Sequence, residues 1–262
     1  MAASSTVLAE LRNEPARAAI LCDIDGTLAP IVADPEAAVV PGEAREVLRE
    51  LASRYSVVAC VSGRRAEAAR HMVGLDELAY AGNHGLELLR PGDREPRIHP
   101  ALGERPDAAR AFLARLERSE LEAAGMRLES KGPIQAIHWR GALDEQGAAR
   151  LAGELAQRAA AEGLIAHFGR KVLEIRPVAE VHKGIAAREL IEGSGVKAAL
   201  FAGDDRTDLD GFAALRGLER EESLELAVCV AIASAEGPAE IRERADLVVE
   251  GTDGFLELLR QL

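Results

Sequence analysis

The feature that most constrains this fold is a regular alternation of short apolar runs with longer amphipathic stretches. Mainly apolar residues fill 18–25, 56–62 and 78–85. Residues 42–55 and 64–73, which separate these runs, place apolar side chains at helical spacing. Runs without polar alternation fit strands that are covered on both faces. Because such strands alternate with helices, the sequence predicts a parallel sheet with helices on both sides.

A second pattern follows residues 90–106, which are rich in proline, glycine and charge and predict a hairpin tip and a linker. Polar and apolar residues then alternate, which predicts half-exposed strands, and the short turns favour antiparallel pairing. We expect helices near 107–123 and 144–162 and strands over 126–131, 134–140, 164–169 and 171–177. These elements predict a small α+β unit with one open sheet face.

The first pattern returns with an expected helix over 182–195 and buried strands over 197–205, 226–233 and 245–251. The sequence therefore predicts an α/β fold with a doubly wound, Rossmann-like parallel-sheet core. An α+β cap domain with an open-faced antiparallel sheet is expected to be inserted into it. The predicted core comprises residues 1–104 and 181–262, and the predicted cap comprises residues 105–180.

Composition and charge narrow the class of protein. The 262 residues are 48% hydrophobic, which is enough for a packed core, and the net charge of -12 argues against general nucleic-acid binding. Cys22, Cys60 and Cys229 all lie in apolar runs and are expected to be buried thiols in a reducing compartment. We see neither a signal peptide nor an apolar run of membrane-spanning length, so we expect a soluble, cytoplasmic protein.

Four polar clusters lie where predicted core strands or the returning chain reach one edge of the sheet. The carboxyl ends of parallel strands meet at this edge, which is where open α/β sheets place their sites. The clusters are Asp23 and Asp25 in "DIDGT", Ser62 in "VSGR", Lys183 in "HKG", and Asp204, Asp205 and Asp208 in "GDDRTDLD".

Carboxylates that converge at one edge repel each other unless a cation lies between them. Hard carboxylate oxygens suit Mg²⁺, which usually binds through few carboxylates together with a phosphate. A lysine and a serine are groups that hold the remaining phosphate oxygens, and an aspartate beside a phosphate can act as a nucleophile. Each cluster alone is also compatible with an ordinary turn or helix start, but their joint order favours phosphate chemistry.

These motifs resemble those of haloacid-dehalogenase-superfamily phosphatases, and several further stretches resemble the trehalose-6-phosphate phosphatase family. The likeness extends over essentially the whole chain. Leu209 departs from the pattern, because an acidic residue commonly follows "GDDRTD" in the family. The matching stretches are "DGTLAPI" (25–31), "VSGR" (61–64), "GNHGLEL" (82–88), "ESKG" (129–132), "HWR" (138–140), "LEIRP" (173–177) and "GDDRTD" (203–208).

The resemblance implies roles for the core residues. Asp23 would be the nucleophile and a Mg²⁺ ligand, and Asp25 would be the general acid/base, with its main-chain carbonyl on the metal. Asp204 would be the second carboxylate ligand, and Asp205 and Asp208 would be ligands or would orient the waters of the metal. The expected phosphate-binding residues are Gly26, Thr27, Ser62, Gly63 and Lys183. Lys183 would also be catalytic, because it neutralises charge on the phosphoryl group during transfer.

The resemblance also implies sugar-binding residues, because the core alone recognises only the phosphate. Strand alternation places Glu129 and Lys131 on one face, and Glu174 and Arg176 on one face. The alternative for such pairs is an ordinary solvated sheet face. The sequence leaves the role of Arg64 open, between a substrate contact and a helix start. The expected substrate-binding residues are Asn83, His84, Glu129, Lys131, His138, Glu174 and Arg176. The alternative for His84 is a satisfied loop histidine, and the alternative for His138 is a cross-strand packing residue beside Trp139.

The function implied is Mg²⁺-dependent hydrolysis of trehalose 6-phosphate through an aspartyl-phosphate, with a functional link to a trehalose-phosphate synthase. Alternatives are a phosphatase for sucrose phosphate or mannosyl-3-phosphoglycerate, a phospho-accepting signalling switch, or an inactive sugar-binding domain. No nucleic-acid or membrane partner is expected. The sequence leaves the oligomeric state open, and a monomer is compatible with it.

Overall fold

The computed structural model of the chain describes residues 2–32, 37–102, 107–169, 171–177, 181–234 and 237–262. It forms two compact units: unit 1 contains Met1–His99 and Val181–Leu262, and unit 2 contains Pro100–Glu180. The domain boundaries expected after residues 104 and 180 fall on residues outside the described ranges, so they stay predictions.

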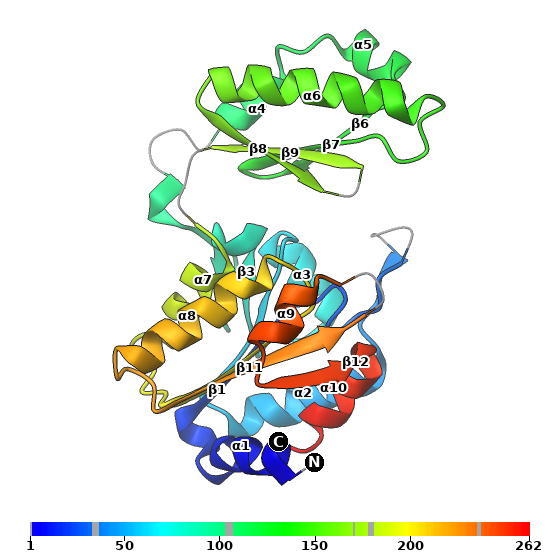
Figure 1. Ribbon diagram of the computed structural model, residues 1–262. Helices are drawn as coiled ribbons and strands as arrows, with labels where there is room; N and C mark the ends of the chain where they lie inside the picture. The colour runs from blue at the N-terminus through cyan, green and yellow to red at the C-terminus, as the bar shows by residue number, and fades with distance from the viewer. Residues whose placement is uncertain (1, 33–36, 103–106, 170, 178–180, 235–236) are drawn as a thin grey trace. The chain divides into compact units, whose positions relative to one another are not determined.

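Unit 1 is built on one eight-stranded sheet with the order β12-β11-β10-β1-β2-β3-β4-β5 (Figure 1). Six strands run parallel, and β1 lies beside both β2 and β10, which is the point where the strand order reverses. The parallel strands are β1 (Ala18–Cys22), β2 (Val57–Val61), β3 (Ala79–Gly82), β10 (Ala198–Gly203), β11 (Leu226–Ala233) and β12 (Leu247–Glu250). This arrangement confirms the predicted doubly wound core.

The sheet also carries an antiparallel edge that the sequence did not predict as strands. β4 (Glu87–Leu89) pairs with β3, and the two-residue β5 (Arg97–Ile98) pairs with β4. Residues 90–96 connect them, and within this segment Asp93 accepts a hydrogen bond from the Arg90 N–H. Strands this short show little periodicity, which explains why only a hairpin tip was predicted here.

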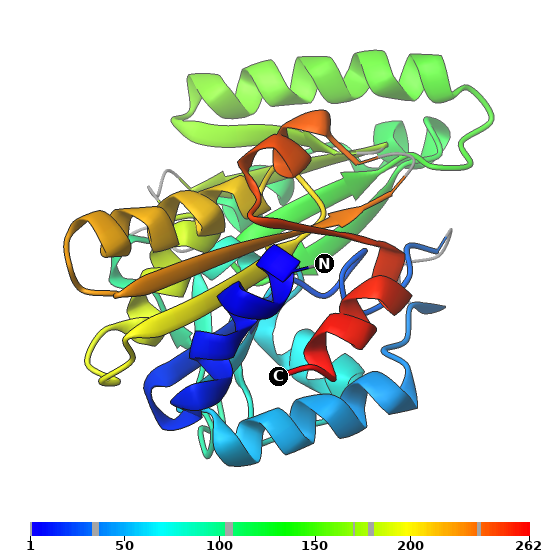
Figure 2. The same cartoon turned by 60° about the horizontal axis from the view of Figure 1, so that its bottom comes forward.

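Helices cover both faces of this sheet (Figure 1). On one face, α1 (Ala2–Asn13), α2 (Gly42–Arg54), α3 (Ala66–Val73) and α10 (Gly251–Leu259) pack into one apolar core. On the other face, α7 (Lys183–Ile191), α8 (Asp208–Arg220) and α9 (Ala239–Arg244) pack into a second. Figure 2 shows α1 in blue beside α10 in red, and the Arg12 guanidinium donates to the carbonyl of Gln261.

Unit 2 is a four-stranded antiparallel sheet with helices on one face (Figure 1). Its strands follow the order β6 (Arg127–Lys131), β7 (Ile134–His138), β9 (Val172–Pro177) and β8 (Leu164–Gly169). α4 (Ala108–Leu113), α5 (Arg118–Ala123) and α6 (Glu145–Ala161) share one core with the apolar face of this sheet. Among the described residues, the opposite sheet face carries none of these helices.

The single helix expected over 107–123 is wrong, because α4 and α5 are separate. Phe112 and Leu121 both pack into the core of unit 2. In an unbroken helix, residues nine apart point in opposite directions, since each residue turns by about 100°. The break after Leu113 lets both side chains face the sheet.

Within the part of the chain that the structure describes, no helix has the length and apolar character needed to cross a membrane.

Gly82, the last residue of β3, lies directly against the start of α3. A Cβ atom at this position would lie 2.1 Å from the backbone nitrogen of Ala66. The strand and the helix can approach this closely only because residue 82 has no side chain.

We expect Gly82→Ala to lower the free energy of unfolding by about 1–3 kcal/mol, because the new methyl group must push α3 away from the sheet. Urea denaturation of the full chain measures this. The matched control is Gly42→Ala, since nothing lies within 4 Å of a Cβ at that position. Equal stability of the two variants would contradict the close approach.

Candidate active site

Three buried aspartates meet at the carboxyl edge of β1 and β10. Asp23 follows β1, and its N–H donates to the Ala202 carbonyl at 2.9 Å. Asp204 follows β10, and Asp208 begins α8. One carboxylate oxygen from each of the three lies within 4.8 Å of the others. The strand reversal at β1 and β10 therefore places these carboxylates in one cluster.

Lys183 reaches into this cluster from the first turn of α7. Its Nζ donates to Oδ1 of Asp23 and Oδ1 of Asp208, each at 2.7 Å, and the residue is only 3% exposed. Burial by itself would lower the pKa of Lys183, but the charges of Asp208 and Asp23 outweigh it and raise that pKa. The lysine is therefore held as a buried ammonium.

One ammonium does not balance three buried carboxylates. Burial raises the pKa of Asp23, Lys183 opposes this, and Asp208 and Asp204 raise it further. Burial and then Asp208 raise the pKa of Asp204 to about 7. Oδ1 of Asp204 is buried and has no hydrogen-bond partner among the described residues. An orphaned oxygen in a set of hard oxygen donors fits a divalent cation held by these aspartates.

The structure separates the roles of the two remaining acidic residues of "GDDRTD". Oδ2 of Asp208 accepts hydrogen bonds from the backbone N–H groups of Asp204 and Asp205 at 3.1 and 3.0 Å. Asp208 therefore binds both Lys183, through Oδ1, and the loop that follows β10, through Oδ2. Asp205 is exposed, and its Oδ1 accepts the N–H of Arg206. The structure does not bring the Asp205 side chain into the buried cluster, and its predicted metal role stays a prediction.

The loop after β1 fits tightly under Asp204. Gly26 has a φ of +88°, and a Cβ there would lie 2.2 Å from Oδ2 of Asp204. Only glycine adopts this φ without strain and leaves room for the Asp204 carboxylate. Thr27 is fully buried, and its Oγ1 has no hydrogen-bond partner within the described part of the chain. A bound ligand would satisfy this buried hydroxyl, and the phosphate role expected for Thr27 stays a prediction.

Arg64 holds the side chain of Asp25. Its Nε and one terminal nitrogen donate to the two carboxylate oxygens at 2.7 and 2.6 Å. The carboxylate of Asp25 is therefore occupied by Arg64 and is not part of the buried aspartate cluster. The Arg64 N–H also donates to Oγ of the buried Ser62 at 3.1 Å. The sequence left the role of Arg64 open, and the geometry ties it to Asp25.

Asn83 and His84 form a tight turn after β3, with φ values of +50° and +58°. Asn83 has no exposed surface, and its Nδ2 donates to Glu87 at 2.9 Å. The expected contact between Asn83 and a sugar stays a prediction. The ring of His84 lies against Gly63, where a Cβ would be 2.8 Å from it. A side chain at position 63 would collide with this ring, so the packing of His84 requires glycine there. The phosphate role expected for Gly63 stays a prediction.

The expected sugar-binding residues of unit 2 share one sheet face. Glu129 is opposite Ala136, and Ala136 is opposite Glu174, so the three side chains point the same way. Lys131 Nζ donates to Oε1 of Glu174 at 2.7 Å. On the same face, His138 Nε2 lies 2.8 Å from Oε2 of Glu129.

Arg176 completes this polar face of unit 2. It follows Glu174 by two residues on β9, so both side chains leave the strand on the same side. Its Nε is buried and has no hydrogen-bond partner among the described residues. The face therefore offers carboxylate, ammonium, imidazole and guanidinium groups to a polar ligand.

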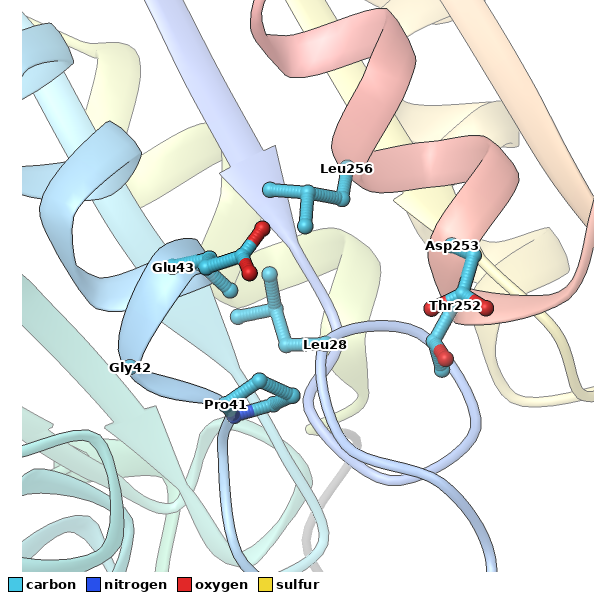
Figure 3. Close-up of a pocket in the computed structure, with 8 residues that line it drawn as sticks. Leu28, Pro41, Gly42, Glu43, Thr252, Asp253 and Leu256 are labelled. Atoms are coloured by element: carbon cyan, nitrogen blue, oxygen red, sulfur yellow. The ribbon is translucent and has the colours of Figure 1, made fainter.

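A separate hollow lies between the first turns of α2 and α10 and the loop after β1 (Figure 3). None of the predicted site residues lines it, and the acidic Glu43 and Asp253 lie at its two helix starts. We assign it no function. Its lining consists of Leu28, Pro41, Gly42, Glu43, Ala44, Thr252, Asp253 and Leu256.

Comparison with known proteins agrees with this geometry. A family profile described as Trehalose-phosphatase matches residues 21–245. The chain belongs to this family. It is 35% identical to "Probable trehalose-phosphate phosphatase 9" of Oryza sativa subsp. japonica over 228 residues, which cover 76% of this chain and 60% of that protein. It is also 35% identical to "Trehalose 6-phosphate phosphatase RA3" of Zea mays, over 75% of this chain and 58% of that protein.

The fold of this family member is shared with solved structures. The C-terminal domain of C. albicans trehalose-6-phosphate phosphatase aligns with a TM-score of 0.77 and 23% identity, over 98% of this chain and 95% of that one. The chain spans about 60% of the length of the curated relatives named above.

The raised pKa of Asp204 predicts a pH-dependent effect of its removal. A carboxyl whose folded pKa is raised stabilises the fold at low pH and loses this as the pH rises through about 7. In EDTA-treated protein at about pH 8, we expect Asp204→Asn to raise Tm by about 2–4 °C. The gain should shrink as the pH falls from 7 toward the ordinary value of 3.8.

Thermal melts at several pH values measure this effect. Asp76→Asn is the matched control, because that side chain is 90% exposed. A lower Tm for Asp204→Asn at about pH 8 would show that the ionised Asp204 carboxylate does not destabilise the metal-free fold.

Proposed function

We propose that this chain is a Mg²⁺-dependent phosphatase that hydrolyses trehalose 6-phosphate to trehalose and inorganic phosphate. The observation that carries the proposal is the buried cluster of Asp23, Asp204 and Asp208 with Lys183 between two of them. Membership of the trehalose-phosphatase family supports the substrate. Within the proposal, residues 105–180 form the specificity domain, and a trehalose-phosphate synthase supplies the substrate in the cytoplasm.

In the first step, the Asp23 carboxylate attacks phosphorus, and the bond from phosphorus to the sugar oxygen breaks. Asp25 gives its proton to the departing oxygen, which leaves as the free hydroxyl of trehalose. In the second step, Asp25 takes a proton from water, which attacks the aspartyl-phosphate and releases phosphate. Asp25 must be free of Arg64 to do this, and an incoming phosphate is an alternative partner for that guanidinium.

The cation belongs among the three buried aspartates. Asp23 and Asp204 would hold it directly, with Asp208 positioned to do so or to orient its waters. When bound, it supplies positive charge that stabilises the phosphoryl oxygens during transfer. We favour Mg²⁺ because the donors are carboxylate oxygens and the partner is a phosphate.

The remaining core residues act on the phosphoryl group and on the nucleophile. Lys183 keeps Asp23 in place by its hydrogen bond and adds positive charge beside it. The hydroxyls of Thr27 and Ser62 are donors for phosphoryl oxygens, together with backbone N–H groups near Gly26 and Gly63.

Selection of a disaccharide requires several fixed polar groups, and unit 2 supplies them. The Lys131–Glu174 and His138–Glu129 pairs hold each other in place on one sheet face. Arg176 adds a guanidinium to the same face. These groups match the donors and acceptors that sugar hydroxyls require.

The first experiment measures phosphate release with Mg²⁺ from trehalose 6-phosphate, sucrose 6-phosphate, glucose 6-phosphate and mannosyl-3-phosphoglycerate. We expect preference for the trehalose ester. Asp23→Asn should reduce kcat by about 10³-fold or more, because an amide is a poor nucleophile. EDTA should abolish release, and added Mg²⁺ should restore it.

Each outcome has a separate meaning. Preference for another ester would keep the core mechanism and overturn the specificity assigned to unit 2. Absence of release from every ester would favour a phospho-accepting switch or an inactive sugar-binding domain.

Lys131→Ala tests the polar face of unit 2. We expect it to raise KM for trehalose 6-phosphate about tenfold, since it removes a donor from this face together with its hydrogen bond to Glu174. Hydrolysis of p-nitrophenyl phosphate, which has no sugar, should change little. Arg150→Ala, on the helix α6 of the same unit, is the control. Equal losses on both substrates would refute a sugar contact by Lys131.

A further inference from the structure

Glu87 is a buried carboxylate that the proposed mechanism does not use. It is the first residue of β4 and is only 1% exposed. Oε2 accepts the N–H of Ala66 at 2.8 Å, and Oε1 accepts Nδ2 of Asn83 at 2.9 Å. Burial of a carboxylate is costly unless its hydrogen bonds are satisfied. Nε of Arg65 also lies 3.6 Å from Oε1, so the carboxylate has one ion pair beside its two hydrogen bonds.

The first contact fixes the start of α3. Ala66 is the first residue of this helix, and the residue before it, Arg65, makes no side-chain capping bond. The first N–H groups of a helix lack partners within the helix, and a carboxylate there is favoured by the helix dipole. Glu87, which lies on β4, therefore caps the N-terminus of α3 by accepting the Ala66 N–H.

The second contact fixes the turn after β3. Asn83 and His84 both adopt left-handed φ values, which need support from their surroundings. Asparagine tolerates this conformation better than most residues. The carboxylate of Glu87 holds the Asn83 amide, so it holds the first residue of this turn.

The turn and the loop after β2 are joined by backbone hydrogen bonds. The Asn83 N–H donates to the Arg64 carbonyl at 2.7 Å, and the His84 N–H donates to the Ser62 carbonyl at 3.0 Å. Glu87 therefore contacts both ends of one connected unit, which contains Ser62 and Arg64. Arg64 in turn holds both carboxylate oxygens of Asp25.

We propose that Glu87 is a positioning residue for the catalytic site. By fixing Ala66 and Asn83, it sets the place of Ser62 and of Arg64 relative to Asp25. The inference deepens the proposed phosphatase function and rests on it for its effect on catalysis. A purely structural role is the alternative, in which Glu87 stabilises unit 1 without affecting the chemistry.

An exchange of donor and acceptor between the two side chains tests the proposal. Asn83→Asp places two carboxylates in a buried contact. In the double variant Asn83→Asp/Glu87→Gln, the amide oxygen introduced at position 87 still accepts the Ala66 N–H, and the amide nitrogen donates to the new carboxylate. The contact then has the same geometry with its direction reversed, and aspartate also tolerates the left-handed φ.

We expect Asn83→Asp to lower kcat for trehalose 6-phosphate about 10- to 100-fold with a smaller change in KM, because small displacements of catalytic groups are costly. The double variant should recover to within about threefold of the wild type, which a sum of independent effects does not predict. Thermal melts of each variant separate loss of folding from loss of positioning.

A second readout does not depend on activity. The Nε–H of Arg64 donates to Asp25, so its ¹⁵N–¹H NMR signal reports this pair, and Arg64→Lys assigns it. We expect the signal to shift or broaden in Asn83→Asp and Glu87→Gln and to return in the double variant. If Asn83→Asp does not fold, Glu87→Gln and the double variant still carry this comparison.

The outcomes distinguish the two proposals. An inactive wild type would sink the phosphatase function while the Arg64 signal still tested the positioning by Glu87. An unchanged Arg64 signal and unchanged kcat, with only a lowered Tm, would overturn the positioning role. A double variant as impaired as Asn83→Asp alone would overturn it as well.

Discussion

The structure depends most on the two hydrogen bonds from Lys183 to Asp23 and Asp208. They gather residues far apart in the sequence at the point where the order of parallel strands reverses. Three carboxylates cannot be buried together without positive charge, and Lys183 supplies part of it. Burial first, and then the neighbouring carboxylates, raise the pKa of Asp23 and Asp204, and a divalent cation would relieve both effects.

A second network surrounds this centre and holds its loops. Arg64 binds Asp25, and Asp208 accepts the N–H groups of its own loop. Glu87 accepts hydrogen bonds from Ala66 at the start of α3 and from Asn83 in the turn after β3. Buried polar groups are stable only when their partners are in place, so such networks fix one arrangement of the loops. Thr27 Oγ1 and Asp204 Oδ1 are buried atoms for which the described residues supply no hydrogen-bond partner.

The order of the strands and helices could be predicted well because each element has its own periodicity. Buried runs such as 18–25 and alternating runs such as 134–140 differ in pattern, and the sheet type follows from that difference. The antiparallel edge of β4 and β5 and the break between α4 and α5 were missed. Strands of two or three residues are too short to show a periodic pattern. The break between the two helices depends on which side chains face the core, and the local sequence does not show this.

The sequence by itself determined the chemistry of the site, because "DIDGT", "HKG" and "GDDRTD" supply carboxylates and a lysine at strand and helix ends. Only the tertiary structure decided which of them meet: Asp23, Asp204 and Asp208 form the cluster, whereas Asp205 stays exposed. It also gave Asn83 a buried partner in Glu87. Contacts between distant segments depend on register and packing, which act between elements and not within them.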